Sequence, residues 1–242
     1  MTSAAPEVSI VIPVYNEEAI LIESLTELME DLEEVDFTYE IIVAENGSTD
    51  ETVALAQDFA ATHAQVSTFS AGEPNYGKAL REGILRARGT FVICDEIDLC
   101  DVSFYQVAIP RLGEGYDLVV GSKCAPGSRD RRPLYRRAAT RILNKMLRVA
   151  VGFKGTDTHG LKAFRREALL QIVRDCVVEK DMFASEFVVR THRSEHRWTE
   201  VPIDLIEKRP PSINLFRRVP NVVRNIVRLT LIIRAGRDLP RR

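Results

Sequence analysis

The stretch "FVICDEIDLCD", Phe91–Asp101, begins as a buried strand should and ends in acidic residues. Four apolar residues in a row predict a strand in a sheet that is covered on both faces. Side chains alternate along a strand, so in extended geometry Glu96 and Asp98 share one face and Asp95 points to the other. Two carboxylates held close together repel each other unless a cation lies between them. On charge alone a solvated acidic loop is a simpler interpretation than a cation site. Motifs elsewhere in the chain are needed to choose between the two.

The composition is that of an ordinary globular protein. The 242 residues are 45% hydrophobic and 28% charged, enough for one domain with an extension or for two domains. Four cysteines lie far apart without a CxxC pair, which indicates neither a zinc site nor a disulfide framework and suits a reducing cytosol. The N-terminal residues lack the pattern of a signal peptide, and no apolar run approaches the roughly 20 residues that span a bilayer. We therefore expect a cytoplasmic protein.

The net charge of −2 conceals an asymmetry along the chain. Residues 212–242 contain eight arginines and one aspartate, a net of +7, which leaves −9 for residues 1–211. A basic end of this kind is typical of contact with an anionic surface, either nucleic acid or membrane.

Short apolar runs alternate with amphipathic ones, which predicts an α/β fold with a mostly parallel sheet flanked by helices. The continuous, β-branched runs predict strands at Val8–Val14, Tyr39–Ala44, Val66–Ser70, Phe91–Cys94 and Asp117–Ser122. Apolar residues at helical spacing predict helices at Glu18–Leu32, after Gly47, at Lys78–Arg88, at Val102–Leu112 and from Leu134 to about Val149.

The amino-acid composition changes after Ser122. The segment "KCAPGSRDRRPLYRR" is rich in proline, glycine and basic residues, which indicates a functional loop and not a core element. We expect a catalytic domain over residues 1–211, with one half at about 8–122 and a second at about 123–211. Residues 212–242 form a basic amphipathic tail.

Polar residues collect where the predicted strands end. The ligand crevice of an open parallel sheet lies at the carboxyl ends of its strands. Here the first strand ends in "PVYNEE", the second in "ENGSTD" and the fourth in "EID". Neither a G-x-G-x-x-G fingerprint nor a P-loop is present, which argues against a dinucleotide fold and a P-loop enzyme.

These motifs resemble those of the family 2 glycosyltransferases, which have the Rossmann-like GT-A fold. The family's P-x-Y-N-E, D-D-G-S-T-D and D-x-D read here as "PVYNE" at 13–17, "ENGSTD" at 45–50 and "EID" at 96–98. With Gly89 as the fixed point, "GTFVICDEIDL" aligns without a gap to the family pattern, which again selects Glu96 and Asp98. The resemblance covers residues 8 to about 208.

The second half looks most like the polyprenyl-phosphate sugar transferases, the dolichyl-phosphate mannose synthase group. "VVGSKCAPGS" is similar to their G-S-R-x-x-x-G-G, with Lys123 at the arginine, and Arg137 falls at a second phosphate-binding arginine. "VPIDLIEK" resembles the family's V-P-I followed by a basic residue, which is Lys208 here and the third candidate cation for the acceptor phosphate. The chain departs from the family pattern at five positions, where other residue types replace the usual ones: Glu45, Asn46, Glu96, Cys100 and His159.

The resemblance implies a hexosyltransferase that uses Mg²⁺ or Mn²⁺ and a nucleotide diphosphate sugar. Asp98 and Glu96 are the expected catalytic metal ligands, with Asp101 as a weaker candidate that more commonly caps a helix. The residues expected to bind the nucleotide sugar are Pro13, Tyr15, Glu17, Glu45, Asn46, Lys78, Glu96 and Asp98.

The expected acceptor is a polyprenyl phosphate, held by Lys123, Arg137 and Lys208. An ionised phosphate needs no general base, only cations that place it beside the anionic diphosphate. The loop and the helix that follows supply several: Lys123, Arg129, Arg131, Arg132, Arg136 and Arg137.

Two alternatives remain open from the sequence. In the first the acceptor is a hydroxyl, for which Asp157 or Glu186 is the candidate base. In the second the chain binds a nucleotide sugar without catalysis, which the replacements at Glu45, Asn46 and Glu96 permit. His159 is a metal ligand, an acceptor contact or a structural turn residue. The sugar, the base and the oligomeric state are not readable from the motifs.

The tail segment "PNVVRNIVRLTLIIRA", 220–235, predicts an amphipathic helix. Its arginines and apolar face suit a helix lying in the surface of an anionic membrane, which we expect as its partner in place of nucleic acid. We therefore expect a peripheral protein on the inner, cytoplasmic face of the cell membrane. A helix docked on the catalytic core explains the same pattern.

Overall fold

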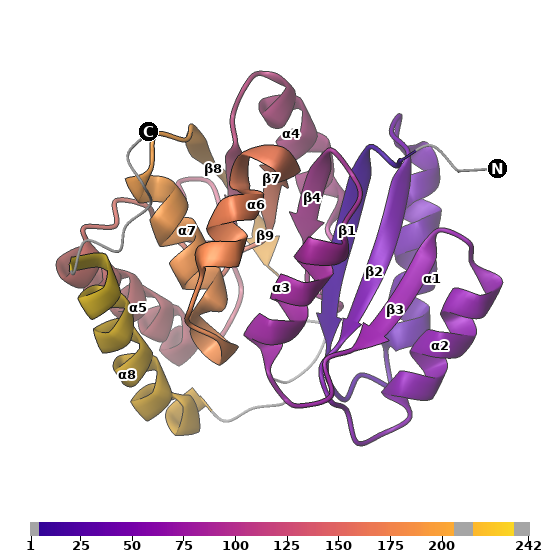
Figure 1. Cartoon of the computed structure of the whole chain (residues 1–242), viewed down its shortest axis with the longest axis horizontal. Helices are drawn as coiled ribbons and strands as arrows, with labels where there is room; N and C mark the ends of the chain where they lie inside the picture. Colours follow the sequence, from indigo (N-terminus) through magenta and orange to yellow (C-terminus); the bar gives the residue numbers. More distant parts are fainter. Residues whose placement is uncertain (1–4, 206–214, 235–242) are drawn as a thin grey trace.

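The computed structural model describes residues 5–205 and 215–234. Its centre is a seven-stranded sheet in the order β3-β2-β1-β4-β7-β5-β8, in which β7 is antiparallel to both neighbours and the other pairs are parallel (Figure 1). The strands are β1 (Val8–Val14), β2 (Tyr39–Glu45), β3 (Val66–Ser70), β4 (Phe91–Cys94), β5 (Leu118–Ser122), β7 (Lys162–Arg165) and β8 (Trp198–Pro202). A separate parallel pair joins β6 (Arg129–Asp130) to β9 (Asp204–Leu205).

Helices cover both faces of this sheet. They are α1 (Leu21–Asp31), α2 (Thr52–Thr62), α3 (Tyr76–Arg86), α4 (Val102–Gly113), α5 (Leu134–Val151), α6 (Arg166–Asp175), α7 (Phe183–Arg193) and α8 (Leu215–Arg234), with short 3₁₀ turns η1 (Leu32–Glu34) and η2 (Lys180–Met182). The five strands and the helices expected from the apolar patterns are present, with ends that differ by a few residues. β7, the antiparallel insertion between β4 and β5, was not predicted.

The core has two halves because side chains alternate through the sheet. Val11, Val92 and Phe164 face a cluster that includes α3, α6 and α7, whereas Ile10 and Ile93 face a cluster with α1, α2 and α4. All five side chains are buried. Alternate residues of one strand are therefore aimed at different helical layers.

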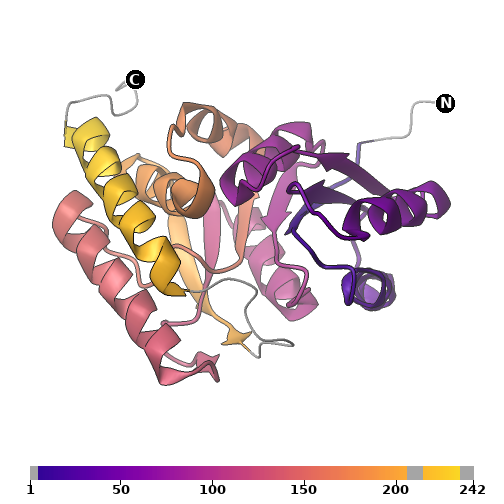
Figure 2. The same cartoon turned by 90° about the horizontal axis from the view of Figure 1, so that it is seen from below.

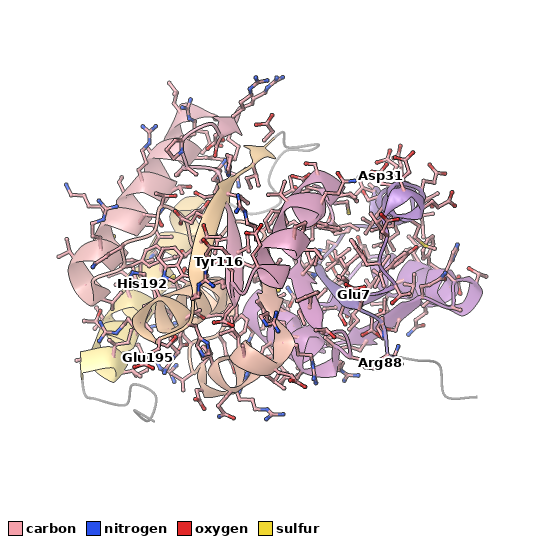
Figure 3. The ribbon with its side chains drawn as sticks, turned by 90° about the horizontal axis from the view of Figure 1, so that it is seen from above. Glu7, Asp31, Arg88, Tyr116, His192 and Glu195 are labelled. Atoms are coloured by element: carbon pink, nitrogen blue, oxygen red, sulfur yellow. The ribbon has the colours of Figure 1, made fainter. Side chains whose placement is uncertain are left out.

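The two ends of the sheet differ in their residues. The arrowheads of β1 and β2 lie at the lower edge in Figure 1, so Figure 2 looks onto the carboxyl ends of these strands. Figure 3 looks from the opposite side, where Glu7, Arg88 and Tyr116 precede β1, β4 and β5. There Arg88 pairs with the buried Glu40 at 2.6 Å. The residues singled out in the sequence follow the strands at the other end.

The C-terminal helix α8 packs on the core. Ile226, Leu229 and Ile233 are at most 5% exposed and belong to the cluster that includes α3, α6 and α7. α8 lies beside α5 in Figures 1 and 2. The docked helix, the alternative to a free membrane helix, is thus the arrangement that the structure shows.

None of the helices in the described ranges is both long and apolar enough to cross a membrane.

Candidate active site

The loops that follow β1 and β2 are held together by hydrogen bonds. Asn16 adopts a left-handed backbone conformation with φ of 53°, which asparagine tolerates better than most residues. Its N–H donates to Ser48 Oγ at 2.9 Å, and its Oδ1 accepts from Thr49 N–H at 2.9 Å. The next amide, Glu17 N–H, donates to Thr52 Oγ1 at 2.8 Å. These bonds fix the ends of both strands relative to each other.

At the end of β2, Glu45 and Asn46 are both buried. Glu45 Oε1 accepts a hydrogen bond from Ser48 N–H, while Glu45 Oε2 is buried and has no partner. Asn46 Oδ1 accepts from Asn75 N–H at 2.5 Å. An unpaired buried carboxylate oxygen costs free energy unless a donor reaches it. Glu45 is therefore prepared to accept a hydrogen bond from a ligand.

At the end of β4, the Asp95 carboxylate forms hydrogen bonds within the fold. Its carboxylate accepts from Tyr105 Oη at 2.5 Å, from Glu96 N–H at 2.6 Å and from Asp101 N–H at 3.0 Å. Burial raises the pKa of Asp95 to about 7, which these hydrogen bonds oppose. Asp101 caps α4, because its Oδ1 accepts from Phe104 N–H. Both residues shape the turn that carries Glu96 and Asp98.

Glu96 points to the other layer, where Tyr76 Oη donates to Glu96 Oε1 at 2.7 Å. Burial and the nearby charge of Asp98 together raise the pKa of Glu96 to about 7, although the hydrogen bond from Tyr76 and the charge of Lys162 oppose the increase. Lys162 is itself buried on β7 and donates to Gly160 O at 2.6 Å. A cation beside the half-buried Glu96 and Asp98 would favour the charged form of both.

The start of α3 bridges the ends of β2 and β4. Asn75 bonds to Asn46 and accepts from Lys78 N–H as the cap of α3, and the adjacent Tyr76 bonds to Glu96. Gly77 lets the start of α3 lie close against η2 and α7, since a Cβ there would lie 2.7 Å from Phe183 Cβ. The helix start thus forms a wall between the two acidic strand ends.

The remaining residues predicted to bind the nucleotide sugar lie around this edge. Pro13 is buried within β1, Tyr15 is half-buried directly after it, and Glu17 is 6% exposed. Lys78 Nζ donates to Ala71 O at 3.1 Å and pairs with Glu73 at 3.2 Å, on the first turn of α3.

On the acceptor side, Lys123 is occupied by an intramolecular ion pair. Its Nζ lies 2.8 Å from Asp157 Oδ2, and the two side chains are 8% and 1% exposed. Burial of Asp157 raises its pKa, but Lys123 outweighs this and lowers the pKa to about 2. The predicted phosphate ligand therefore holds the loop before β7 against the loop after β5.

Arg137 lies in the first turn of α5 and is half-buried. No ion pair or side-chain hydrogen bond of Arg137 occurs within the described ranges, unlike Arg132, which pairs with Asp130 at 2.8 Å. Lys208, the third predicted phosphate ligand, lies outside the described residues.

Three further candidates have structural contacts. His159 Nδ1 lies within hydrogen-bond distance of the Thr158 and Ser185 hydroxyls. The backbone N–H of His159 donates to Asp157 Oδ1. Glu186 pairs with the buried Arg190 at 2.8 Å and accepts two backbone N–H bonds at the start of the 177–180 segment. Asp157 and Glu186, the candidate bases for a hydroxyl acceptor, are thus both engaged.

Sequence reasoning missed Tyr76, Asn75 and Lys162. Lys162 gave no signal of its burial, because a lysine in a short segment such as "LKAF" is normally expected at the surface. Tyr76 gave no signal either, because its contact with Glu96 depends on how α3 packs.

No cluster of three or more metal-binding side chains occurs in the described part of the chain. Mg²⁺ commonly binds to only one or two protein carboxylates and completes its shell with water and phosphate oxygens. The pair Glu96 and Asp98 fits this mode, in which the metal and a diphosphate bind together.

The sequence profile described as "Glycosyl transferase family 2" matches residues 9–173, which include both acidic strand ends and the Lys123–Asp157 pair. The chain belongs to this family.

Three relatives illustrate the similarity. The chain is 31% identical to "Glycosyltransferase AglD" of Haloferax volcanii, over 94% of this chain and 37% of that protein. It is 28% identical to "Dolichyl-phosphate beta-glucosyltransferase ALG5D" of Trichomonas vaginalis, over 81% of this chain and 65% of that protein. It is 34% identical to "Undecaprenyl-phosphate 4-deoxy-4-formamido-L-arabinose transferase" of Aeromonas hydrophila, over 76% of this chain and 57% of that protein. The chain therefore spans between 37% and 65% of the length of these relatives.

Solved structures share the fold. A mycobacterial protein superimposes with a TM-score of 0.68 at 23% identity, covering 96% of this chain and 76% of that chain. Glucosyl-3-phosphoglycerate synthase from Mycobacterium tuberculosis, in complex with Mn²⁺, UDP and phosphoglyceric acid, superimposes with a TM-score of 0.66 at 21% sequence identity. The match covers 96% of this chain and 80% of that chain. The predicted GT-A fold is confirmed.

Proposed function

We propose that this protein is a metal-dependent, inverting hexosyltransferase that moves a sugar from a nucleotide diphosphate sugar to a polyprenyl phosphate. The observation that carries the proposal is the group of carboxylates at one edge of the sheet. Glu45 offers a buried, unpaired oxygen there, and a cation would favour the charged form of Glu96, whose pKa burial and the charge of Asp98 raise to about 7. A nucleoside diphosphate with its metal supplies both the missing donor and the missing charge.

On the donor side, Glu45 Oε2 accepts an N–H of the base or a ribose hydroxyl. Asn46 positions the start of α3, and Pro13 and Tyr15 wall the base. We assign Glu17 and Lys78 to the border of the same site. The acidic character of this edge suits a metal complex better than a free diphosphate, which three carboxylates would repel.

Glu96 and Asp98 would hold Mg²⁺ or Mn²⁺, with Asp98 as the first ligand. Such a metal stabilises the negative charge that develops on a departing diphosphate. Tyr76 keeps Glu96 in place through the 2.7 Å hydrogen bond, and Asp95 holds the turn beneath it. The solved relative with Mn²⁺ and UDP shares the fold, which is consistent with this assignment.

On the acceptor side, Arg137 is the leading phosphate ligand because its guanidinium has no partner in the described residues. We assign Lys123 and Lys208 as supporting cations, Lys123 acting while paired with Asp157. A phosphate acceptor is favoured over a hydroxyl, since Asp157 has a pKa near 2 and Glu186 is paired with Arg190. Neither carboxylate is suited to remove a proton at neutral pH.

We assign the donor half to residues 8–122 and the acceptor half to residues 123–211, with the basic segment 212–242 at an anionic, cytoplasmic membrane surface. Relatives named for dolichyl and undecaprenyl phosphates support this setting. In α8 the exposed Arg224 and Arg228 lie on the side away from the core.

A panel of nucleotide diphosphate sugars tests the proposal. Each donor is incubated with a short-chain prenyl phosphate and with Mn²⁺ or Mg²⁺, and the product is identified by mass spectrometry. We expect one donor to give a glycosyl prenyl phosphate with inverted anomeric configuration, and Asp98→Ala to give none. Transfer only to hydroxyl compounds would exclude the phosphate acceptor. Nucleotide binding without turnover of any donor would favour the non-catalytic alternative.

A further inference from the structure

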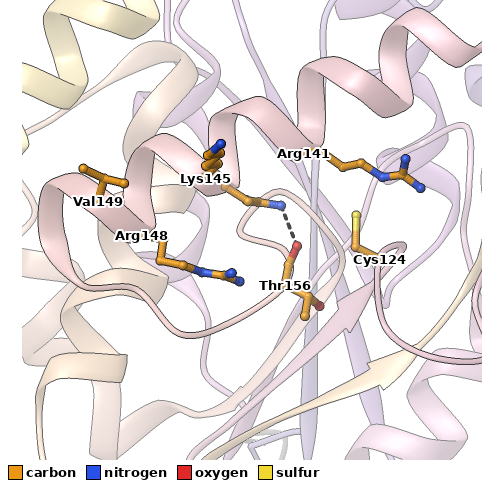
Figure 4. Close-up of a pocket in the computed structure, with 7 residues that line it drawn as sticks. Cys124, Arg141, Lys145, Arg148, Val149 and Thr156 are labelled. Carbon is orange, nitrogen blue, oxygen red and sulfur yellow. Dashed lines mark hydrogen bonds between the residues drawn. The ribbon is translucent and has the colours of Figure 1, made fainter.

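A basic pocket lies beside α5 and includes Cys124 and Thr156, which lie in the loops that follow β5 and precede β7. Its volume is about 440 Å³ (Figure 4). It is lined by Cys124, Arg141, Asn144, Lys145, Arg148, Val149 and Thr156. None of these residues belongs to the donor site or to the acceptor site assigned above.

Three cations of α5 line this pocket. Arg141, Lys145 and Arg148 are each exposed, and they follow one another at helical spacing along one side of α5. Within the ranges that the structure describes, none of the three forms an ion pair or a side-chain hydrogen bond. Three like charges close together on a helix repel one another, and an anion that binds between them relieves the repulsion.

Asn144 provides a second, independent indication of a ligand. This residue is 7% exposed and lines the pocket. Its Nδ2 donates to Thr156 O at 2.5 Å, drawn as the dashed line in Figure 4, whereas its Oδ1 is buried without a partner. The dianion of a simple phosphate monoester has no hydrogen to give to this oxygen. A phosphate ester that also carries a hydroxyl can satisfy both the cations and Asn144.

Exposed apolar side chains gather on α5, which carries the pocket's cations, and on the neighbouring α8. Every large apolar side chain that is more than half exposed in the described residues lies on α5 or α8, namely Leu134, Tyr135, Ile142, Val149, Val227 and Leu231. The two helices lie side by side at one end of the molecule in Figures 1 and 2. Exposed apolar residues among arginines and lysines are what an element at a lipid headgroup layer requires.

We propose that this pocket binds the headgroup of an anionic, hydroxyl-bearing phospholipid such as phosphatidylglycerol. The outer faces of α5 and α8 then contact the acyl boundary around it. The charge pattern favours a lipid over a protein partner, because cations line the pocket and exposed apolar side chains lie on the same helix and on α8. The inference rests on the proposed membrane setting of the protein but not on sugar transfer.

Binding of the full chain to phosphatidylcholine vesicles, with and without phosphatidylglycerol, tests the inference by cosedimentation. The triple variant Arg141→Gln/Lys145→Gln/Arg148→Gln is compared with Arg86→Gln/Arg111→Gln/Arg174→Gln, which removes three exposed arginines from α3, α4 and α6. Each basic residue at an anionic bilayer changes binding roughly fivefold, so we expect the pocket variant to lose about 100-fold and the control variant only a few-fold. Urea unfolding of both variants checks that each is folded.

Two further arms identify the ligand. We expect tighter binding to phosphatidylglycerol than to phosphatidylmethanol, an anionic phosphodiester without a headgroup hydroxyl, at equal surface charge, because only the former brings a hydroxyl to Asn144. We also expect soluble glycerol phosphate not to release the protein from vesicles. Equal losses in the two triple variants, equal binding to the two lipids, or full release by glycerol phosphate would each overturn the inference. The measurement contains no sugar donor, so its result is independent of whether the protein is a transferase.

Discussion

Replacing Lys123 by methionine tests whether this lysine serves the acceptor or the fold. Lys123 Nζ and Asp157 Oδ2 are 2.8 Å apart, and both side chains are buried. Removing one partner of a buried ion pair commonly costs about 3–5 kcal/mol, because the other charge is left uncompensated. We therefore expect Lys123→Met and Asp157→Asn each to lower the free energy of unfolding by this amount. The double variant should lose less than the sum of the two.

The matched control is Arg137→Met, which removes a cation that has no ion pair or side-chain hydrogen bond within residues 5–205 and 215–234. We expect its free energy of unfolding to change by no more than about 0.5 kcal/mol, while use of a prenyl phosphate falls. Urea unfolding at pH 7 measures all four variants. If Lys123→Met proves as stable as Arg137→Met, the ion pair is not a structural element and Lys123 is free for the acceptor.

The pH dependence of stability provides a second check on the same pair. The pKa of Asp157 is lowered from 3.8 to about 2, so its contribution is complete above about pH 4 and is lost as the pH falls toward 2. At about 1.4 kcal/mol for each pKa unit, the loss is about 2 kcal/mol. The double variant should not show this part of the acid destabilisation.

Three further predictions concern the donor site and the last helix. Glu45→Gln should weaken nucleotide binding by about tenfold or more, since a charged acceptor of a hydrogen bond is lost; calorimetric titration with UDP and GDP measures this, and unchanged affinity for both would place the base elsewhere. Tyr76→Phe should raise the metal concentration needed for half-maximal nucleotide binding, because Glu96 loses its 2.7 Å hydrogen bond; an identical metal titration would show that Tyr76 does not position Glu96. Leu229→Ala should lower the free energy of unfolding by about 2–5 kcal/mol, whereas Leu231→Ala, at a residue that is 64% exposed, should change it by less than about 0.5 kcal/mol; similar values for the two would mean that α8 is not docked as described.

The strands of the sheet could be predicted because their apolar runs are continuous and β-branched. The alternation of side chains also separates Asp95 from Glu96, and the hydrogen bonds to Tyr105 on α4 and Tyr76 on α3 place the two on opposite layers. β7 was missed because its four residues include Lys162, which reads as a surface residue unless its burial is known.

The contacts between distant segments could not be predicted in the same way. Lys123 and Asp157 are 34 residues apart, and no local pattern pairs them. The tail gave an amphipathic pattern, but one apolar face serves a membrane or a protein core equally well. Only the burial of Ile226, Leu229 and Ile233 shows which of these the helix contacts.

Donor binding and catalysis, as proposed, both depend on a metal-dependent nucleotide site at Glu96 and Asp98. The most direct test is calorimetric titration of UDP and GDP into the full chain, with and without Mn²⁺, for the wild type and Asp98→Asn. For at least one nucleotide we expect Mn²⁺ to tighten binding to the wild type by at least about tenfold, because the metal offsets the repulsion between carboxylates and diphosphate. Asp98→Asn should abolish this gain, while Asp95→Asn, in a protein that still folds, should retain it. Equal affinity with and without Mn²⁺ in the wild type, or an equal loss in the two variants, would contradict the proposed site.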